Sequence, residues 1–218
     1  MLDWRGIDTV LLDMDGTLLD LNFDNYFWQE HVPIRYAEKY SLEVQEARET
    51  LMPRFREAEG TMEWYCVDYW SRILGLDIAR LKAEVDHLIA VHPHVVEFLD
   101  ALRERGIRRV LVTNAHRKSL MLKLDRTGIG SHLDRIVCSH DFGMPKEDPA
   151  FWSRLKAELD FSRERSLLID DSLPVLRSAR AYGIAHLLAV RKPDSRQPEK
   201  DVAEFQAIRD FRDIIPAE

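Results

Sequence analysis

Acidic residues stand at the ends of two apolar segments, where they could hold a cation. Asp13 and Asp15 follow the first such segment, and Asp170 and Asp171 follow a later one. Four carboxylates in one place repel one another strongly unless a cation neutralises them. Since no His or Cys stands at a matching spacing, this all-oxygen set predicts a hard metal ion, Mg²⁺, with these four residues as ligands. Asp15 would bind it through its backbone carbonyl, Asp170 directly, and Asp171 through water or a lysine.

The two aspartates at positions 13 and 15 could carry out the two steps of phosphate ester hydrolysis. A carboxylate nucleophile such as Asp13 attacks phosphorus and forms an aspartyl phosphate, which divides the hydrolysis into two steps. Asp15 can protonate the leaving oxygen and later deprotonate the attacking water. We therefore expect Asp13 to be the nucleophile and Asp15 the general acid and base.

Further polar groups could hold the oxygens of a phosphoryl group. Gly16 lets the backbone turn sharply, so that the backbone amides of Met14 and Gly16 can face these oxygens. The side chains of Thr113 and Asn114, which follow another apolar segment, are expected to bind them as well. Lys146 would bind the phosphoryl group and offset the charge of the nucleophile, so Thr113 and Lys146 are expected to be catalytic.

Each of these motifs has a simpler structural explanation when it is taken alone. Asp and Gly dominate turns, so residues 13–17 could form an ordinary turn. An Asp pair favours the start of a helix, and a Thr-Asn pair can be a helix N-cap. The occurrence of all these motifs in this order, each at the end of a predicted strand, favours the chemical interpretation.

The elements that position these residues alternate between short apolar runs and amphipathic segments. Apolar runs of this kind are typical of strands buried on both faces of a parallel sheet. The alternation predicts a doubly wound, Rossmann-like α/β domain. The predicted strands are residues 7–13, 110–113, 135–138, 166–170 and 186–190, and the predicted helices are 95–105, 117–127, 150–159 and 174–182.

The long gap after the first predicted strand has a different pattern. Residues 20–92 contain no convincing strand and show helical periodicity with many aromatic positions. Some 70 helical residues cannot form a simple crossover loop. We therefore predict a helical cap domain at 20–92, inserted after the first strand of a catalytic core made of residues 1–19 and 93–218.

Composition and charge argue against several classes of partner. With 31 Lys and Arg against 38 Asp and Glu, the formal net charge is −7, which disfavours nucleic acid polymers and anionic membranes. No apolar run approaches the ~18 residues of a membrane span, and residues 1–7 show no secretion signal. Cys66 and Cys138 are expected to be reduced thiols in the cytoplasm. The oligomeric state stays open, and a monomer is compatible with the sequence.

Taken together, the motifs at 13–17, 112–114, 146 and 169–171 resemble the four motifs of the haloacid dehalogenase superfamily, and residues 20–92 resemble its C1 cap. The resemblance covers the whole core and implies the strand order 5-4-1-2-3. Superfamily members that act on carbon–halogen bonds lack the second acid of the first motif. The presence of Asp15 therefore implies the phosphatase branch.

A closer resemblance, to the bacterial GMP/IMP nucleotidases, runs through the cap and several loops. It rests on residues 18–28, 64–70, 113–116, 142–148, 193–195 and 214–216. It implies release of phosphate from purine nucleoside 5′-monophosphates, GMP and IMP, as the small-molecule substrates.

A purine could bind to the cap through stacking and through its polar edge. Trp28 and Trp64 could stack on the base, since an aromatic contact contributes ~1–3 kcal/mol per base. Asp24, Asn25 or Asp68 could recognise the oxo-purine edge, and His116 could border the site. Aromatic residues at helical spacing also commonly form the small core of such a cap, so both interpretations stay open.

Two other functions would use similar residues. The same core could serve a phosphatase or phosphomutase for sugar phosphates or phosphoglycolate. A receiver-like signalling module also combines acidic residues, a Thr and a Lys around Mg²⁺. In such modules, however, the acidic pair precedes the phosphorylated Asp, and no cap is present.

Overall fold

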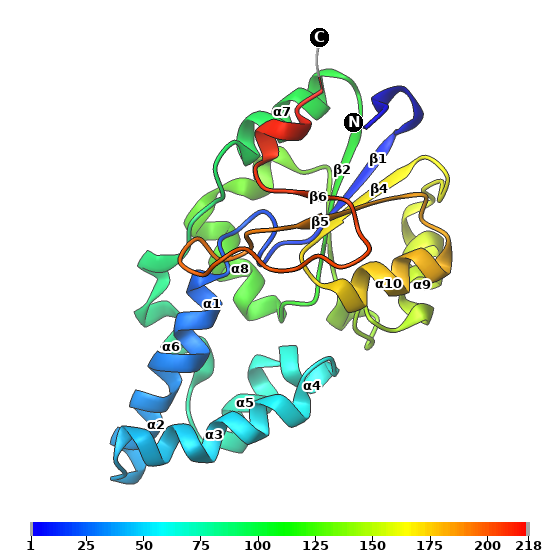
Figure 1. Cartoon of the computed structure of the whole chain (residues 1–218). Coiled ribbons are helices and arrows are strands. Elements are labelled where there is room, and N and C mark those ends of the chain that lie inside the picture. Colours follow the sequence, from blue (N-terminus) through cyan, green and yellow to red (C-terminus); the bar gives the residue numbers. More distant parts are fainter. Residues whose placement is uncertain (1, 217–218) are drawn as a thin grey trace.

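A six-stranded parallel sheet forms the centre of the computed structural model, which describes residues 2–216 (Figure 1). The strand order is β3-β2-β1-β4-β5-β6, so its first five strands confirm the expected arrangement, with β1 between β2 and β4. The short sixth strand is absent from the prediction, because two residues are too few to show an apolar pattern. The strands are β1 (Thr9–Leu12), β2 (Arg108–Thr113), β3 (Arg135–Cys138), β4 (Ser166–Asp170), β5 (His186–Val190) and β6 (Ala207–Ile208).

Alternate residues of β1 face opposite sides of the sheet, and helices cover both sides. Val10 and Leu12 pack with α7 and α8, whereas Leu11 packs with α9 and α10 (Figure 1). A strand enclosed in this way has to be apolar throughout. The doubly wound α/β class is therefore confirmed. The helices are α7 (Val95–Glu104), α8 (Arg117–Thr127), α9 (Pro149–Leu159) and α10 (Leu173–Tyr182), with short 3₁₀ turns η1 (Trp4–Gly6), η4 (Ile129–His132), η5 (Ser139–Asp141) and η6 (Phe211–Ile214).

Between β1 and α7 the chain forms helices and no strand of the sheet, and this helical insert lies below the sheet in Figure 1. The two chain segments that enter and leave the insert run side by side. There the Asp20 amide donates to the Ala90 carbonyl at 2.9 Å, and the His92 amide donates to the Leu18 carbonyl at 2.9 Å. The helices are α1 (Asn22–Tyr26), the π-helical η2 (Phe27–His31), α2 (Val32–Tyr40), α3 (Val44–Ala58), α4 (Met62–Tyr65), α5 (Val67–Leu74), α6 (Ile78–Glu84) and η3 (Asp86–Leu88).

The division into a cap at 20–92 and a core at 1–19 and 93–218 stays a prediction. The paired chains at residues 18–20 and 90–92 support these inner limits. The outer limits at residues 1 and 218, and the first residue of the segment considered for a secretion signal, lie outside the described residues.

Aromatic side chains form the interior of the helical insert. Trp70 and Phe55 are buried, with ring centroids 5.0 Å apart in an edge-to-face arrangement. Trp28 contacts both of these rings and stacks on Trp64 with centroids 6.4 Å apart. Offset and edge-to-face pairs of this kind stabilise an interior beyond their burial alone. The aromatic residues of the insert thus pack mainly on one another.

Within residues 2–216, no helix is long and apolar enough to cross a membrane. Both cysteines are free: Cys138 is buried at the end of β3, and Cys66 is half-buried before α5.

Candidate active site

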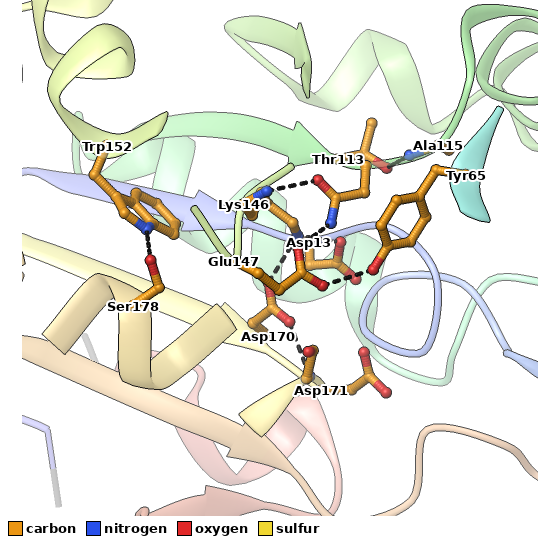
Figure 2. Close-up of polar contacts among 12 residues, drawn as sticks. Asp13, Tyr65, Thr113, Ala115, Lys146, Glu147, Trp152, Asp170, Asp171 and Ser178 are labelled. Atoms are coloured by element: carbon orange, nitrogen blue, oxygen red, sulfur yellow. Dashed lines mark hydrogen bonds and ion pairs between the residues drawn. The ribbon is translucent and has the colours of Figure 1, made fainter. Parts of the chain in front are cut away.

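The predicted catalytic residues meet at the carboxyl ends of β1, β2 and β4 (Figure 2). Asp13 directly follows β1, Thr113 ends β2, and Asp170 ends β4. In sheets with helices on both sides, ligands bind at this edge, where the strand order reverses. The topology therefore brings together residues that are far apart in the sequence.

Lys146 joins two of these strand ends. Its Nζ donates to Asp13 Oδ1 at 2.6 Å and to Asp170 Oδ2 at 2.7 Å. Its backbone amide donates to Asn114 Oδ1 at 2.9 Å, which fixes the loop before α9. Burial alone would lower the pKa of Lys146, but the two carboxylates outweigh it and raise the pKa. Lys146 is therefore a buried, permanently charged cation beside Asp13.

The acidic cluster consists of Asp13, Asp170 and Asp171, and one carboxylate oxygen of each lies within 4.8 Å of those of the other two. Burial raises the pKa of Asp13 to about 6; Lys146 opposes this effect and Asp170 adds to it. Asp13 Oδ2 is buried and has no hydrogen-bond partner within residues 2–216. Because buried polar atoms are nearly always paired, this oxygen is a candidate contact for a ligand.

The loop after β1 requires glycine at position 16. Gly16 has φ of +85°, and a Cβ there would lie 2.8 Å from Asp171 Cγ and 3.0 Å from Pro193 Cβ. Its backbone amide donates to the Leu19 carbonyl at 2.8 Å, so this amide closes the loop and does not face the acidic cluster. Met14 is fully buried. The predicted phosphate-binding role of these two residues thus stays a prediction.

Lys123, which the sequence analysis missed, contacts one of the predicted catalytic residues. It lies on α8, and its Nζ donates to Asp15 Oδ1 and to Asp24 Oδ2, both at 2.6 Å. Lys82 of α6 donates to the other oxygen of Asp24 at 2.8 Å. Both lysine side chains are almost completely buried. The sequence pattern that could have identified Lys123 is its spacing: it stands three residues after Leu120, on the buried side of α8.

Burial and the two lysines shift the pKa values of Asp15 and Asp24 in opposite directions. Burial raises the pKa of Asp15 to about 6, although Lys123 pulls it down. Burial would also raise the pKa of Asp24, but Lys123 and Lys82 together outweigh it and lower the pKa to about 2. Asp15 can therefore exchange a proton near neutral pH, as general acid–base catalysis requires, whereas Asp24 stays ionised.

Other protein groups hold three of the predicted substrate-binding side chains. Both oxygens of Asp24 accept from lysines, as described above. Asn25 donates through Nδ2 to Asp194 Oδ2 at 2.7 Å. Asp68 pairs with Lys118 at 2.5 Å. These contacts compete with recognition of a base edge.

A cavity of about 670 Å³ lies over the acidic cluster and extends between the cap helices. This volume is within the usual range for small-molecule sites. Met14, Gly16 and Asp68 lie outside its lining. The predicted residues that line it are Asp13, Asp15, Asp24, Asn25, Trp28, Trp64, Thr113, Asn114, His116, Lys146, Asp170 and Asp171.

A hydrogen-bonded contact joins the insert to the core at the wall of this cavity. Tyr65 donates through its hydroxyl to Glu147 Oε1 at 2.6 Å, and Asn114 Nδ2 donates to Glu147 Oε2 at 2.9 Å (Figure 2). Burial and the nearby Glu147 raise the pKa of Tyr65, so its hydroxyl stays protonated as a donor. Lys200 similarly pairs with Asp171, at 3.0 Å. Tyr65, Glu147 and Lys200 are absent from the predicted site because their partners lie far away in the sequence.

Comparison with known proteins agrees with this geometry. The haloacid dehalogenase-like hydrolase family matches residues 7–183. The chain is 43% identical over 214 residues to the GMP/IMP nucleotidase YrfG of Escherichia coli, covering 98% of this chain and 96% of that protein. It is 24% identical to a phosphoglycolate phosphatase of Agrobacterium fabrum, over 95% and 90% of the two chains.

A solved structure has the same fold. The crystal structure of a HAD phosphatase from Thermococcus onnurineus has a TM-score of 0.76 at 21% identity, with 95% of each chain covered. The family match spans most of the chain, and the nucleotidase relative spans nearly all of it. This chain therefore belongs to the haloacid dehalogenase-like hydrolases and is an enzyme of the phosphatase type.

Proposed function

We propose that the protein is a Mg²⁺-dependent nucleotidase that hydrolyses GMP and IMP through a phosphate ester on Asp13. The observation that carries the chemistry is the free oxygen of Asp13, buried beside Lys146 and two residues before a carboxyl group with a raised pKa. The near full-length relationship to a GMP/IMP nucleotidase supports the substrate class.

The acidic cluster fits a hard divalent cation. It offers only oxygen donors, and three carboxylates this close together repel one another unless a cation neutralises them. The side chains of Asp13, Asp170 and Asp171 and the backbone carbonyl of Asp15 would hold Mg²⁺. When bound, the ion would neutralise charge on the carboxylates and on the phosphate.

The residues of this chain then divide the hydrolysis between them. The free carboxylate oxygen of Asp13 attacks phosphorus, while the protonated carboxyl of Asp15 gives its proton to the leaving nucleoside oxygen. Asp15, now ionised, takes a proton from a water molecule that attacks the aspartyl phosphate. The products are a nucleoside, inorganic phosphate and the original carboxylate. Lys146 and Thr113 hold the phosphoryl oxygens throughout.

The base would lie in the part of the cavity that belongs to the cap. Trp28 and Trp64 line this part and offer aromatic surface. Because Asp24 is held by two lysines and Asp68 lies outside the lining, recognition of the purine edge falls to Asn25, through its Oδ1 because its Nδ2 donates to Asp194, and His116 would border the base.

A phosphate-release assay on the purified protein tests this function. GMP, IMP, AMP, phosphoglycolate and sugar phosphates are compared with and without Mg²⁺. We expect the highest kcat/KM for GMP and IMP, dependence on Mg²⁺, and no turnover by Asp13→Asn. Faster phosphate release from phosphoglycolate or sugar phosphates than from GMP and IMP would instead favour a phosphatase or phosphomutase for those substrates. A phosphorylated protein that persists without turnover would instead indicate a signalling module.

A further inference from the structure

A second group of side chains that could bind a metal lies where the insert meets the core, and it shares no residue with the acidic cluster. Cys66 precedes α5 in the insert, His116 precedes α8, and His140 lies in η5 of the core. The Cys66 sulfur and one ring nitrogen of each histidine lie within 4.8 Å of one another. Their donor types differ from those of the acidic cluster, since sulfur and imidazole nitrogen suit Zn²⁺ and similar ions rather than Mg²⁺.

His140 has unused binding capacity. Both of its ring nitrogens are buried, and neither has a hydrogen-bond partner among the residues that the structure describes. Buried polar groups are rarely left in this state without a bound water or ion. An imidazole nitrogen with no hydrogen-bond partner is available to bind a metal.

The other two ligands are held in place by the starts of their helices. The Cys66 sulfur accepts from the Tyr69 amide at 3.4 Å. His116 stands edge-to-face with His140, with ring centroids 5.0 Å apart, and its Nδ1 accepts from the Lys118 amide at 3.2 Å. Binding through Nε2 would move the ring proton of His116 to Nδ1 and give up this long hydrogen bond.

A fourth ligand is also within reach. Asp68, on α5 of the insert, has its Oδ2 3.6 Å from Nε2 of His116. Zn²⁺ accepts four ligands drawn from Cys, His and carboxylate groups, and water can fill one position. Asp68, which the sequence analysis assigned to the substrate, is therefore a candidate fourth ligand.

We propose that Cys66, His116 and His140 form a binding site for one Zn²⁺-type ion, with Asp68 or water as the fourth ligand. Binding releases the thiol proton of Cys66 to solvent and forms the metal–sulfur bond, without any change in oxidation state. Because Cys66 belongs to the insert and the two histidines to the core, the bound ion links these two parts of the chain. The proposal does not depend on which substrate the enzyme takes, although His116 also lines the substrate cavity.

Cobalt binding to the full chain tests this site. Co²⁺ is titrated into substrate-free protein in excess Mg²⁺, which occupies the acidic cluster, and thiolate-to-cobalt absorption is recorded. We expect one Co²⁺ per chain with this absorption, displaced by Zn²⁺. Cys66→Ser should abolish the absorption, and His140→Asn should weaken binding by more than ~10-fold, the loss typical of even an outer-shell partner.

Cys138→Ser provides the matched control, because Cys138 is the other free thiol and lies outside this group. It should bind Co²⁺ like the wild type. Metal-free melting curves of the three variants show whether each is folded. The proposal is overturned if no thiolate absorption develops, if Cys66→Ser retains it, or if folded His140→Asn binds Co²⁺ as tightly as the wild type.

Discussion

Replacing Asp24 by Asn should destabilise the fold strongly, because Asp24 is the counter-ion of two buried lysines. The exchange removes the charge but keeps the shape. It leaves Lys82 without its carboxylate partner and leaves Lys123 with Asp15 alone. Breaking a buried ion pair by removing one partner costs about 3–5 kcal/mol. The lowered pKa of Asp24, from 3.8 to about 2, corresponds to about 2 kcal/mol.

The two energies, about 3–5 kcal/mol from the broken ion pair and about 2 kcal/mol from the pKa shift, differ for a physical reason. The pKa shift is a net quantity, in which the cost of burying the carboxylate is already subtracted from the attraction of the lysines. The substitution also leaves the buried ammonium of Lys82 without a carboxylate partner, so the larger value of about 3–5 kcal/mol applies. Because the pKa of Asp24 is lowered, its contribution to stability is present above pH 3.8 and is lost as the pH falls towards 2.

Urea unfolding at neutral pH measures this effect, and Asp68→Asn is the control. Asp68 pairs with Lys118 at a similar distance, but both side chains are more than half exposed. An exposed pair contributes about 0–1 kcal/mol, so this control should unfold nearly like the wild type. A free energy of unfolding for Asp24→Asn within about 1 kcal/mol of the control would refute the buried network.

Three further predictions concern the catalytic loop and the cavity wall. Gly16→Ala should reduce stability by more than ~1 kcal/mol and lower turnover, because the left-handed backbone conformation and the close contact with Asp171 both oppose a Cβ. Gly60→Ala is the control: Gly60 also has a positive φ, but no atom lies near its Cβ position, so this variant should keep its turnover. The kcat/KM for GMP should fall as the pH rises through about 6, where Asp15 loses its proton, and a pH profile of Asp15→Asn should lack this limb. Tyr65→Phe removes the donor to Glu147 and should cost about 1 kcal/mol in kcat/KM for GMP, measured by steady-state phosphate release, whereas unchanged kinetics would exclude a role for this contact.

The core of the fold and the acidic site are predictable because local patterns determine them. Strands enclosed on both faces must be apolar, so β1 and β4 are visible as continuous runs. Their carboxyl ends necessarily meet in a parallel sheet, and this places Asp13 beside Asp170. Two-residue β6 has no such pattern, since only its pairing with β5 defines it.

The charged network around Asp15 could not be predicted in the same way. Asp24 looks like a candidate for base recognition until Lys82 and Lys123, 58 and 99 residues away, are brought onto its two oxygens. A lysine in a helix is normally exposed, so only its partners justify the burial of Lys123. The proximity of Cys66 to His116 and His140 could not be predicted either, because it depends on the contact between the insert and the core.

The most direct test of the central claim is to trap the phosphorylated enzyme. Protein, Mg²⁺ and GMP are mixed, quenched in acid within one turnover, and digested for mass spectrometry. The mechanism predicts one added phosphoryl group on the peptide that contains Asp13, and none on the same peptide of Asp13→Asn. Phosphate release within that turnover with no modification at Asp13 would contradict the mechanism.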